Sequence, residues 1–193
     1  MLEHRAPLDQ LSRARNTETL HDADAGLRVT PVTDRGLLLL QGSPEDAVLR
    51  DAIGRQIGAR VPGPQTTDIR GEYALLWMTP KEWLLELPAA ETSAVQGALV
   101  ARLAPSLAAI TDISDALACF EIGGDPAMDV LMAGCSLDLR PHAFAAGRVA
   151  RTAIADVHAI IWKPGIAHLF RCWVDRSCAQ HFWNWLADSP ARW

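Results

Sequence analysis

Several features that would identify a familiar class of protein are missing from this sequence. Its formal net charge is −5, and no stretch gathers the lysines and arginines that a nucleic-acid-binding surface needs. No apolar run approaches the roughly 20 residues that a membrane-spanning helix requires. Residues 1–15 are polar and contain no signal-peptide core. These absences predict a cytoplasmic protein that binds neither nucleic acid nor membrane.

The sequence also lacks the patterns that mark catalytic and cofactor sites. It contains no glycine fingerprint for a dinucleotide or phosphate and no GxSxG elbow. The four cysteines form no CxxC pair, and the six histidines show no HxH, HExxH or HxxxH spacing. Cys178 and His181 share one face of a predicted helix, but two ligands alone are a weak metal signal. We therefore predict no catalytic, cofactor-binding or metal-binding residue in this chain.

What the sequence does contain is an internal duplication. Val32-Thr33-Asp34, an apolar run and a glycine–proline segment recur about 81 residues later, beginning at Ile113-Ser114-Asp115. Further along, residues 74–77 (ALLW) match residues 159–162 (AIIW). We predict two similar halves, residues 26–106 and 107–193, packed as one compact unit.

Each half has the same predicted order of elements: strand, strand, helix, strand, strand, helix. This order is typical of an α+β fold with segregated hairpins, here with halves related by a pseudo-twofold axis. Ser43 and Asp125 are the predicted helix N-caps, and Gly134 is predicted to end a helix. The predicted strands are 29–32, 37–41, 73–78, 83–87, 107–113, 118–123, 148–153, 157–162 and 168–174, with 33–36 a turn and 58–71 a loop; the helices follow residue 43 and cover 94–103, 127–133 and 177–186.

Two groups of residues allow both a structural and a functional interpretation. Asp34 and Asp115 occupy matching places in the two halves, as turn-forming residues or as ligands. The seven tryptophans include the repeat equivalents Trp77 and Trp162, which we expect in the core. Trp185 is predicted to point away from the inward face of its helix, so it either covers the rim of the core or anchors a partner.

The first 25 residues stand apart as an N-terminal arm. Residues 1–25 are rich in charge and sparse in leucine, which is typical of a solvated, partly disordered segment. The alternative is an arm that becomes ordered on a partner, with Leu8 and Leu11 among its anchors.

Three segments resemble one known family. Residues 113–126 (ISDALACFEIGGDP) resemble the centre of the gamma subunit of heterotetrameric sarcosine oxidase. Residues 134–141 (GCSLDLRP), followed by Phe144, are similar to the most distinctive motif of that family. Residues 174–186, which include FWNWL, are similar to its C-terminal helix.

The resemblance implies a fold related to the folate-binding domain of aminomethyltransferases. It also implies a complex with alpha, beta and delta subunits that oxidatively demethylates sarcosine to glycine and passes the one-carbon unit to tetrahydrofolate. FAD, FMN, NAD, tetrahydrofolate and zinc are then expected in the partner subunits, and no cofactor in this chain. The chain would serve as a non-catalytic structural subunit.

A partner surface is the only kind of site that this interpretation predicts. The candidate contact residues are Leu8, Leu11, Leu137, Leu139, Arg140 and Trp185. The alternative function is a free-standing folate-binding protein of the aminomethyltransferase superfamily, in which Asp115 or Glu121 would hold the pterin.

Overall fold

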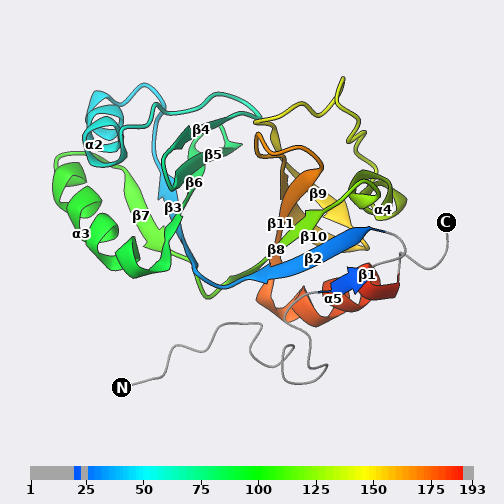
Figure 1. Ribbon diagram of the computed structural model, residues 1–193. Helices are drawn as coiled ribbons and strands as arrows, with labels where there is room; N and C mark the ends of the chain where they lie inside the picture. The colour runs from blue at the N-terminus through cyan, green and yellow to red at the C-terminus, as the bar shows by residue number, and fades with distance from the viewer. Residues whose placement is uncertain (1–19, 23–25, 189–193) are drawn as a thin grey trace, which may run out of the picture. The chain divides into compact units, whose positions relative to one another are not determined.

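The computed structural model describes residues 20–22 and 26–188 (Figure 1). The chain divides into two compact units. One is continuous and covers residues 34–114, and the other combines residues 1–33 with residues 115–193. Within the described residues, no helix has the length and apolar character needed to cross a membrane.

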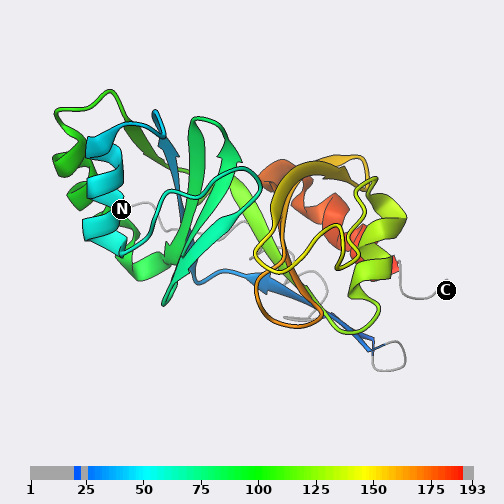
Figure 2. The same cartoon turned by 90° about the horizontal axis from the view of Figure 1, so that it is seen from above.

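The continuous unit is a five-stranded antiparallel sheet with two helices on one face (Figure 2). Both helices contribute to one apolar cluster, through Leu49 and Ile53 of the first and Leu99 of the second. These side chains pack against Leu38 and Leu85 of the sheet. In sheet order the strands are β4 (Thr67–Arg70), β5 (Tyr73–Thr79), β6 (Glu82–Pro88), β3 (Arg35–Gln41) and β7 (Ala109–Asp112); the helices are α2 (Ala47–Ile57), the 3₁₀ turn η1 (Ala89–Glu91) and α3 (Thr92–Leu103).

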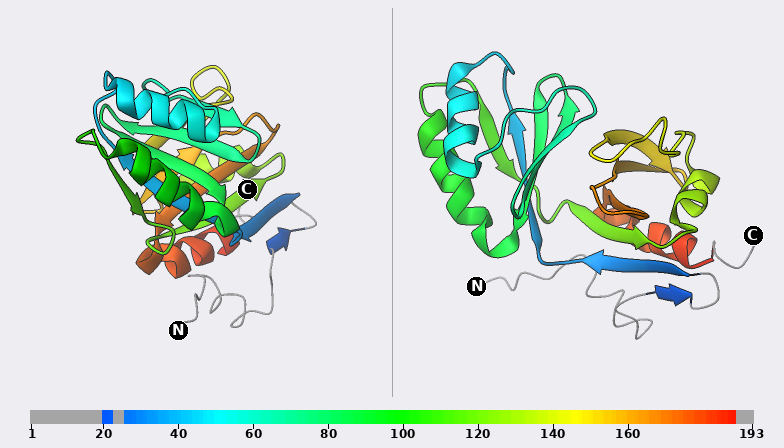
Figure 3. Two further views of the ribbon diagram at one scale, coloured as in Figure 1. Left: turned by 90° about the vertical axis from the view of Figure 1, so that its left-hand side faces the viewer. Right: turned by 45° about the horizontal axis from the view of Figure 1, so that its top comes forward.

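The discontinuous unit is a six-stranded sheet that packs two helices over a second apolar cluster (Figure 3). Phe120 lies at its centre and contacts the rings of Phe182 and Trp183. In sheet order the strands are β1 (Leu20–Asp22), β2 (Leu27–Val32), β8 (Leu117–Gly123), β11 (Leu169–Asp175), β10 (Val157–Trp162) and β9 (Val149–Ile154); the helices are α4 (Ala127–Gly134), the 3₁₀ turn η2 (Arg176–Cys178) and α5 (Ala179–Asp188).

The α+β fold class is confirmed, and the two sheets share one strand order apart from the additional edge strand β1. Five strands of one sheet, β2-β8-β11-β10-β9, correspond to β7-β3-β6-β5-β4 of the other. In each sheet, the first of these strands comes from the opposite half of the sequence. β2 pairs with β8, with Val29 opposite Ile122, and β7 pairs with β3, with Ile110 opposite Leu40.

This strand exchange corrects the predicted connection between residues 29–32 and 37–41. The sequence indicates two strands joined by a turn at 33–36, but β2 and β3 belong to different sheets. It also explains why the compact units break at 33/34 and 114/115, whereas the repeat boundary predicted from the sequence lies at 106/107. Apolar patterning identifies a strand, but it does not identify the distant strand that completes its hydrogen bonds.

Three local predictions are also wrong. The first helix is capped by Asp46, whose carboxylate accepts hydrogen bonds from the backbone N–H groups of Val48 and Leu49, while Ser43 lies outside the helix. Pro126, rather than Asp125, precedes helix α4, and it supplies no side-chain cap. The predicted loop 58–71 contains strand β4, which pairs with β5.

Gly124 forms the turn that leads from strand β8 into helix α4, and its carbonyl oxygen accepts a hydrogen bond from the N–H of Ala127. Its φ is +105°, and a Cβ placed there would lie 2.0 Å from the carbonyl oxygen of Gly26. Only glycine allows this close approach between two backbone segments. The glycine–proline segment at this point is therefore a strand-to-helix turn.

Candidate functional site

The loop between α4 and β9 carries three of the predicted contact residues. Leu139 is fully buried in the apolar cluster, so it is corrected from a contact residue to a core residue. Phe144 is also buried there, and the two side chains fasten the loop to its unit. Leu137 packs against the same cluster but stays partly exposed. Leu8 and Leu11 lie outside the described residues.

Arg140 is held at the tip of this loop by Asp138. Its Nε and Nη2 atoms lie 2.7 and 2.8 Å from the two carboxylate oxygens, and its backbone N–H donates to Oδ1 at 3.0 Å. His142 approaches the same carboxylate at 3.3 Å. The hydrogen bonds from Arg140, with a smaller contribution from His142, lower the pKa of Asp138 to about 2. The loop therefore presents a fixed, charged tip.

Trp185 lies beside the start of the same loop. Its ring stacks on Phe182, with centroids 6.0 Å apart, and covers Gly134 at the end of α4. It is half-buried, so part of the ring covers the core while part remains accessible. We define the loop surface as Leu137, Arg140 and Trp185. The first and last of these pack against one apolar cluster, so residues predicted separately lie on the same unit.

The other tryptophans among the described residues divide between the core and its edge. Trp162 is buried, and its ring stacks on Trp173 with centroids 6.2 Å apart. Trp77 is half-buried against the core of the continuous unit. The sequence predicts that the repeat equivalents Trp77 and Trp162 lie in the core. This prediction is confirmed for Trp162 and only partly for Trp77.

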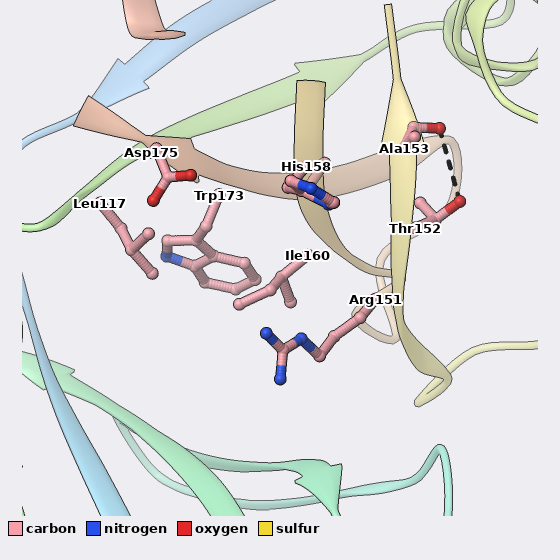
Figure 4. Close-up of a pocket in the computed structure, with 9 residues that line it drawn as sticks. Leu117, Arg151, Thr152, Ala153, His158, Ile160, Trp173 and Asp175 are labelled. Atoms are coloured by element: carbon pink, nitrogen blue, oxygen red, sulfur yellow. Dashed lines mark hydrogen bonds between the residues drawn. The ribbon is translucent and has the colours of Figure 1, made fainter. Parts of the chain in front are cut away.

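The discontinuous unit also contains a pocket of about 390 Å³ on its sheet (Figure 4). The side chains of Arg151, Ile160 and Trp173 follow one cross-strand row and point to the same side, with His158 and Asp175 nearby. In the described part of the chain, no hydrogen bond joins His158 to Asp175. Sequence patterns could not reveal this pocket, because its residues come from separate strands with no shared motif.

The groups with potential chemistry are mostly engaged within the chain. The Nη2 of Arg171 lies 2.6 Å from the Oε1 of Glu121, which the alternative function would assign to a pterin. The Nε2 atom of the His181 imidazole lies 2.9 Å from the carbonyl oxygen of Ala155. This nitrogen is therefore engaged by the backbone and does not bind a metal together with Cys178. Burial, and to a smaller extent the neighbouring Cys135, raises the pKa of the Cys172 thiol far above its usual range.

The duplicated aspartates mark the points where the chain passes between its units. Asp34 begins the continuous unit, and Asp115 follows its last residue. Both side chains are exposed, and the carbonyl oxygen of Asp34 accepts a hydrogen bond from the N–H of Ala89. Among the described residues, no group of three or more histidine, cysteine or acidic side chains is arranged to hold a metal ion.

Comparison with known proteins gives one consistent family. The model of the sarcosine oxidase gamma subunit family matches residues 41–192. A sarcosine oxidase subunit gamma from Corynebacterium sp. (strain U-96) is 31% identical over 157 residues, covering 81% of this chain and 74% of the relative. A subunit of the same name from Arthrobacter sp. is 29% identical over 165 residues, covering 83% and 77%.

Two solved structures have folds similar to that of this chain. A chain of the heterotetrameric sarcosine oxidase from Corynebacterium sp. U-96 superposes with a TM-score of 0.86 at 23% identity, covering 98% of this chain and 96% of that chain. The glycine cleavage system aminomethyltransferase T from Bartonella henselae superposes with a TM-score of 0.70 at 13% identity, covering 95% of this chain and 57% of that chain. The expected aminomethyltransferase-like fold is confirmed.

Proposed function

Because the chain belongs to the sarcosine oxidase gamma subunit family, we propose that it is the gamma subunit of a heterotetrameric sarcosine oxidase. The complex would oxidatively demethylate sarcosine to glycine and pass the one-carbon unit to tetrahydrofolate. The observation that carries this proposal is the family match over residues 41–192, together with curated relatives that are themselves named as subunits.

Within that complex the chain would act as a non-catalytic, structural subunit. This role is supported by the contacts of the side chains that could act in catalysis or binding. Glu121 forms an ion pair with Arg171, and His181 contacts a backbone carbonyl oxygen. A buried thiol with a raised pKa, such as Cys172, is a poor nucleophile. FAD, FMN, NAD, tetrahydrofolate and zinc would belong to the partner subunits.

The loop surface is the proposed contact with an alpha, beta or delta subunit. Stable interfaces favour a well-ordered arginine and a partly exposed tryptophan, because both bury large areas with little loss of freedom. Arg140 is held by Asp138, and Trp185 by stacking on Phe182. Residues 1–25, with Leu8 and Leu11, would extend this contact.

Co-expression with the neighbouring reading frames tests the proposal. A tag on this chain should retain flavin-containing chains through size-exclusion chromatography. The complex, but not the isolated chain, should consume oxygen when sarcosine is added. A tagged chain that recovers no other subunit would contradict the proposal. Micromolar binding of tetrahydrofolate to the isolated chain would instead favour the folate-binding alternative.

Replacement of Arg140 tests the loop surface. We expect Arg140→Ala to weaken subunit association by about tenfold, since truncation of a central arginine is among the costlier interface changes. Arg55→Ala is the matched control, because Arg55 is also an exposed arginine paired with an aspartate, Asp51, at 2.8 Å. Association is measured by native mass spectrometry over a dilution series. Equal effects of the two variants would exclude Arg140 from the interface.

A further inference from the structure

A second cavity lies in the continuous unit. It has a volume of about 500 Å³ and is lined by helix α2 and the loop that follows it. Arg50 and Gly54, one turn apart, line it from the helix, and Arg60 and Gly63 line it from the loop. No described residue that lines the cavity carries a carboxylate. The cavity is therefore a local concentration of positive charge on a chain with a formal net charge of −5.

The wall that carries Arg60 is fixed from both sides. Ala59 is buried in the apolar cluster, and the indole Nε1 of Trp83 donates to the carbonyl oxygen of Pro62 at 3.1 Å. The backbone N–H of Arg60 donates to the Oδ2 of Asp68 at 2.7 Å. A wall that is already ordered loses little conformational freedom when a ligand binds.

The carboxylates of Asp46 and Asp68 accept hydrogen bonds from groups other than the guanidinium groups that line the cavity. The Asp46 carboxylate accepts hydrogen bonds from the helix N-terminus and from the Ser106 hydroxyl. Asp68 accepts from the Arg60 backbone and from the Arg70 guanidinium. The Nη2 of Arg50 donates to a backbone carbonyl at 3.2 Å. In the described part of the chain, the Arg60 guanidinium makes no hydrogen bond or ion pair, so its donors are available.

We propose that this cavity receives an acidic segment of a partner subunit, with an aspartate or glutamate carboxylate bound between Arg50 and Arg60. Guanidinium groups match the planar geometry of a carboxylate with paired hydrogen bonds. Val61 and Pro62 supply apolar surface for the aliphatic part of the side chain. This arrangement suits an acidic side chain better than a free inorganic anion. The inference rests on the proposed function and names the chemistry of one contact.

Charge reversal tests the contact in the assembled complex. We expect the double variant Arg50→Glu/Arg60→Glu to weaken assembly by about tenfold or more at low salt, because like charges would then face each other. In 1 M NaCl, where screening is strong, the difference in assembly between the wild type and the double variant should become much smaller. Arg102→Glu is the control, since Arg102 is an exposed arginine of the same unit on helix α3. Circular dichroism checks that each variant is folded.

A cross-linking variant identifies the partner group directly. Arg60→Lys keeps the charge and supplies an amine that a carbodiimide couples to a carboxylate in contact with it. The background is low, because the chain contains only two lysines, Lys81 and Lys163. Mass spectrometry of the assembled complex should find residue 60 joined to an acidic peptide of another subunit. Arg102→Lys should give no such product.

The outcomes separate this inference from the proposed function. If the wild-type chain recovers no partner, the proposed function fails. If the complex forms but the double variant assembles like the Arg102→Glu control, and no cross-link from residue 60 reaches another chain, the contact is wrong. If calorimetry finds that the isolated wild-type chain binds inorganic phosphate, and the double variant loses this binding but assembles normally, the cavity is a small-anion site and the inference is also overturned.

Discussion

At the scale of single residues, Gly134 links a helix end to the loop surface. A Cβ built on Gly134 would lie 2.5 Å from the Trp185 ring and 3.1 Å from the backbone nitrogen of Ala155. The neighbouring ring cannot move freely, because it stacks on Phe182. The absence of a side chain at Gly134 is therefore what allows Trp185 to lie beside the α4–β9 loop.

An alanine at this position should destabilise the protein. We expect Gly134→Ala to lower the free energy of unfolding by about 1–3 kcal/mol, the usual cost of overpacking. Gly97→Ala is the matched control, because Gly97 lies within helix α3 with no atom within 4 Å of its added Cβ. There the substitution should stabilise the helix by about 0.5–1 kcal/mol. Urea unfolding compares the two, and a neutral Gly134→Ala variant would contradict the packing argument.

Asp138 gives the loop surface its dependence on pH. The folded-state pKa is lowered to about 2 by the hydrogen bonds from Arg140, so the carboxylate stabilises the folded loop at every pH above its unfolded value near 3.8. This contribution should disappear as the pH falls from about 4 to about 2. NMR titration of the carboxyl carbon measures it. In Arg140→Ala the midpoint should rise toward the ordinary value, and an unchanged midpoint would exclude Arg140 as the cause.

At the scale of elements, the start of helix α2 depends on a single carboxylate. Asp46 caps the helix and also accepts a hydrogen bond from Ser106, which precedes strand β7. These hydrogen bonds lower the pKa of Asp46, with the Ser106 hydroxyl as the largest cause. The Asp46 carboxylate therefore connects helix α2 to the segment that leads into strand β7.

Loss of this cap should be measurable in the whole protein. We expect Asp46→Ala to lower Tm by about 2–4 °C, because a helix N-cap and a tertiary hydrogen bond are lost together. Ser43→Ala should leave Tm nearly unchanged, although Ser43 is the cap that the sequence indicates. Differential scanning calorimetry compares the two variants, and equal shifts would assign the cap to both residues.

The positions of the helices and strands were far easier to predict than the elements with which they pack or pair. The strand at 157–162 has the predicted bounds, because a short apolar run rich in β-branched residues follows a local turn. The cap at Asp46 could not be chosen from the sequence, since Ser43 and Pro44 offer an equally good signal three residues earlier. The burial of Leu139 was equally hidden, because a leucine in a loop carries no periodicity. The Arg50–Arg60 cavity needs a loop and a helix face to meet, which only the fold provides.

At the scale of the whole molecule, the strand exchange changes what counts as a folding unit. Residues 34–114 contain every strand of one sheet together with both helices that cover it. The repeat half 26–106 lacks β7 and carries β2, whose pairing partner β8 lies beyond it. A repeat in the sequence and a compact unit in space are therefore different segments of the chain.

Two fragments of equal length should behave differently for this reason. We expect residues 34–114 to unfold cooperatively in urea, because their sheet and core are complete. Residues 26–106 should show a broad transition, since strand β3 loses one neighbour and β2 has none. Circular dichroism and tryptophan fluorescence measure both. Equal cooperativity would mean that β7 adds little to the stability of its sheet.

The strand exchange also determines the order in which the two units can fold during synthesis. The ribosome releases β2 early, but β8, its neighbour on one side, appears only after the whole continuous unit has been made. Residues 34–114 can therefore fold while the chain is still growing, whereas the sheet around β8 must wait for β11 and β10 near the C-terminus. During that interval β2 has a free edge. The loop surface, which includes Trp185, belongs to the unit that is completed last, so the subunit contact proposed for it can form only after that unit has folded.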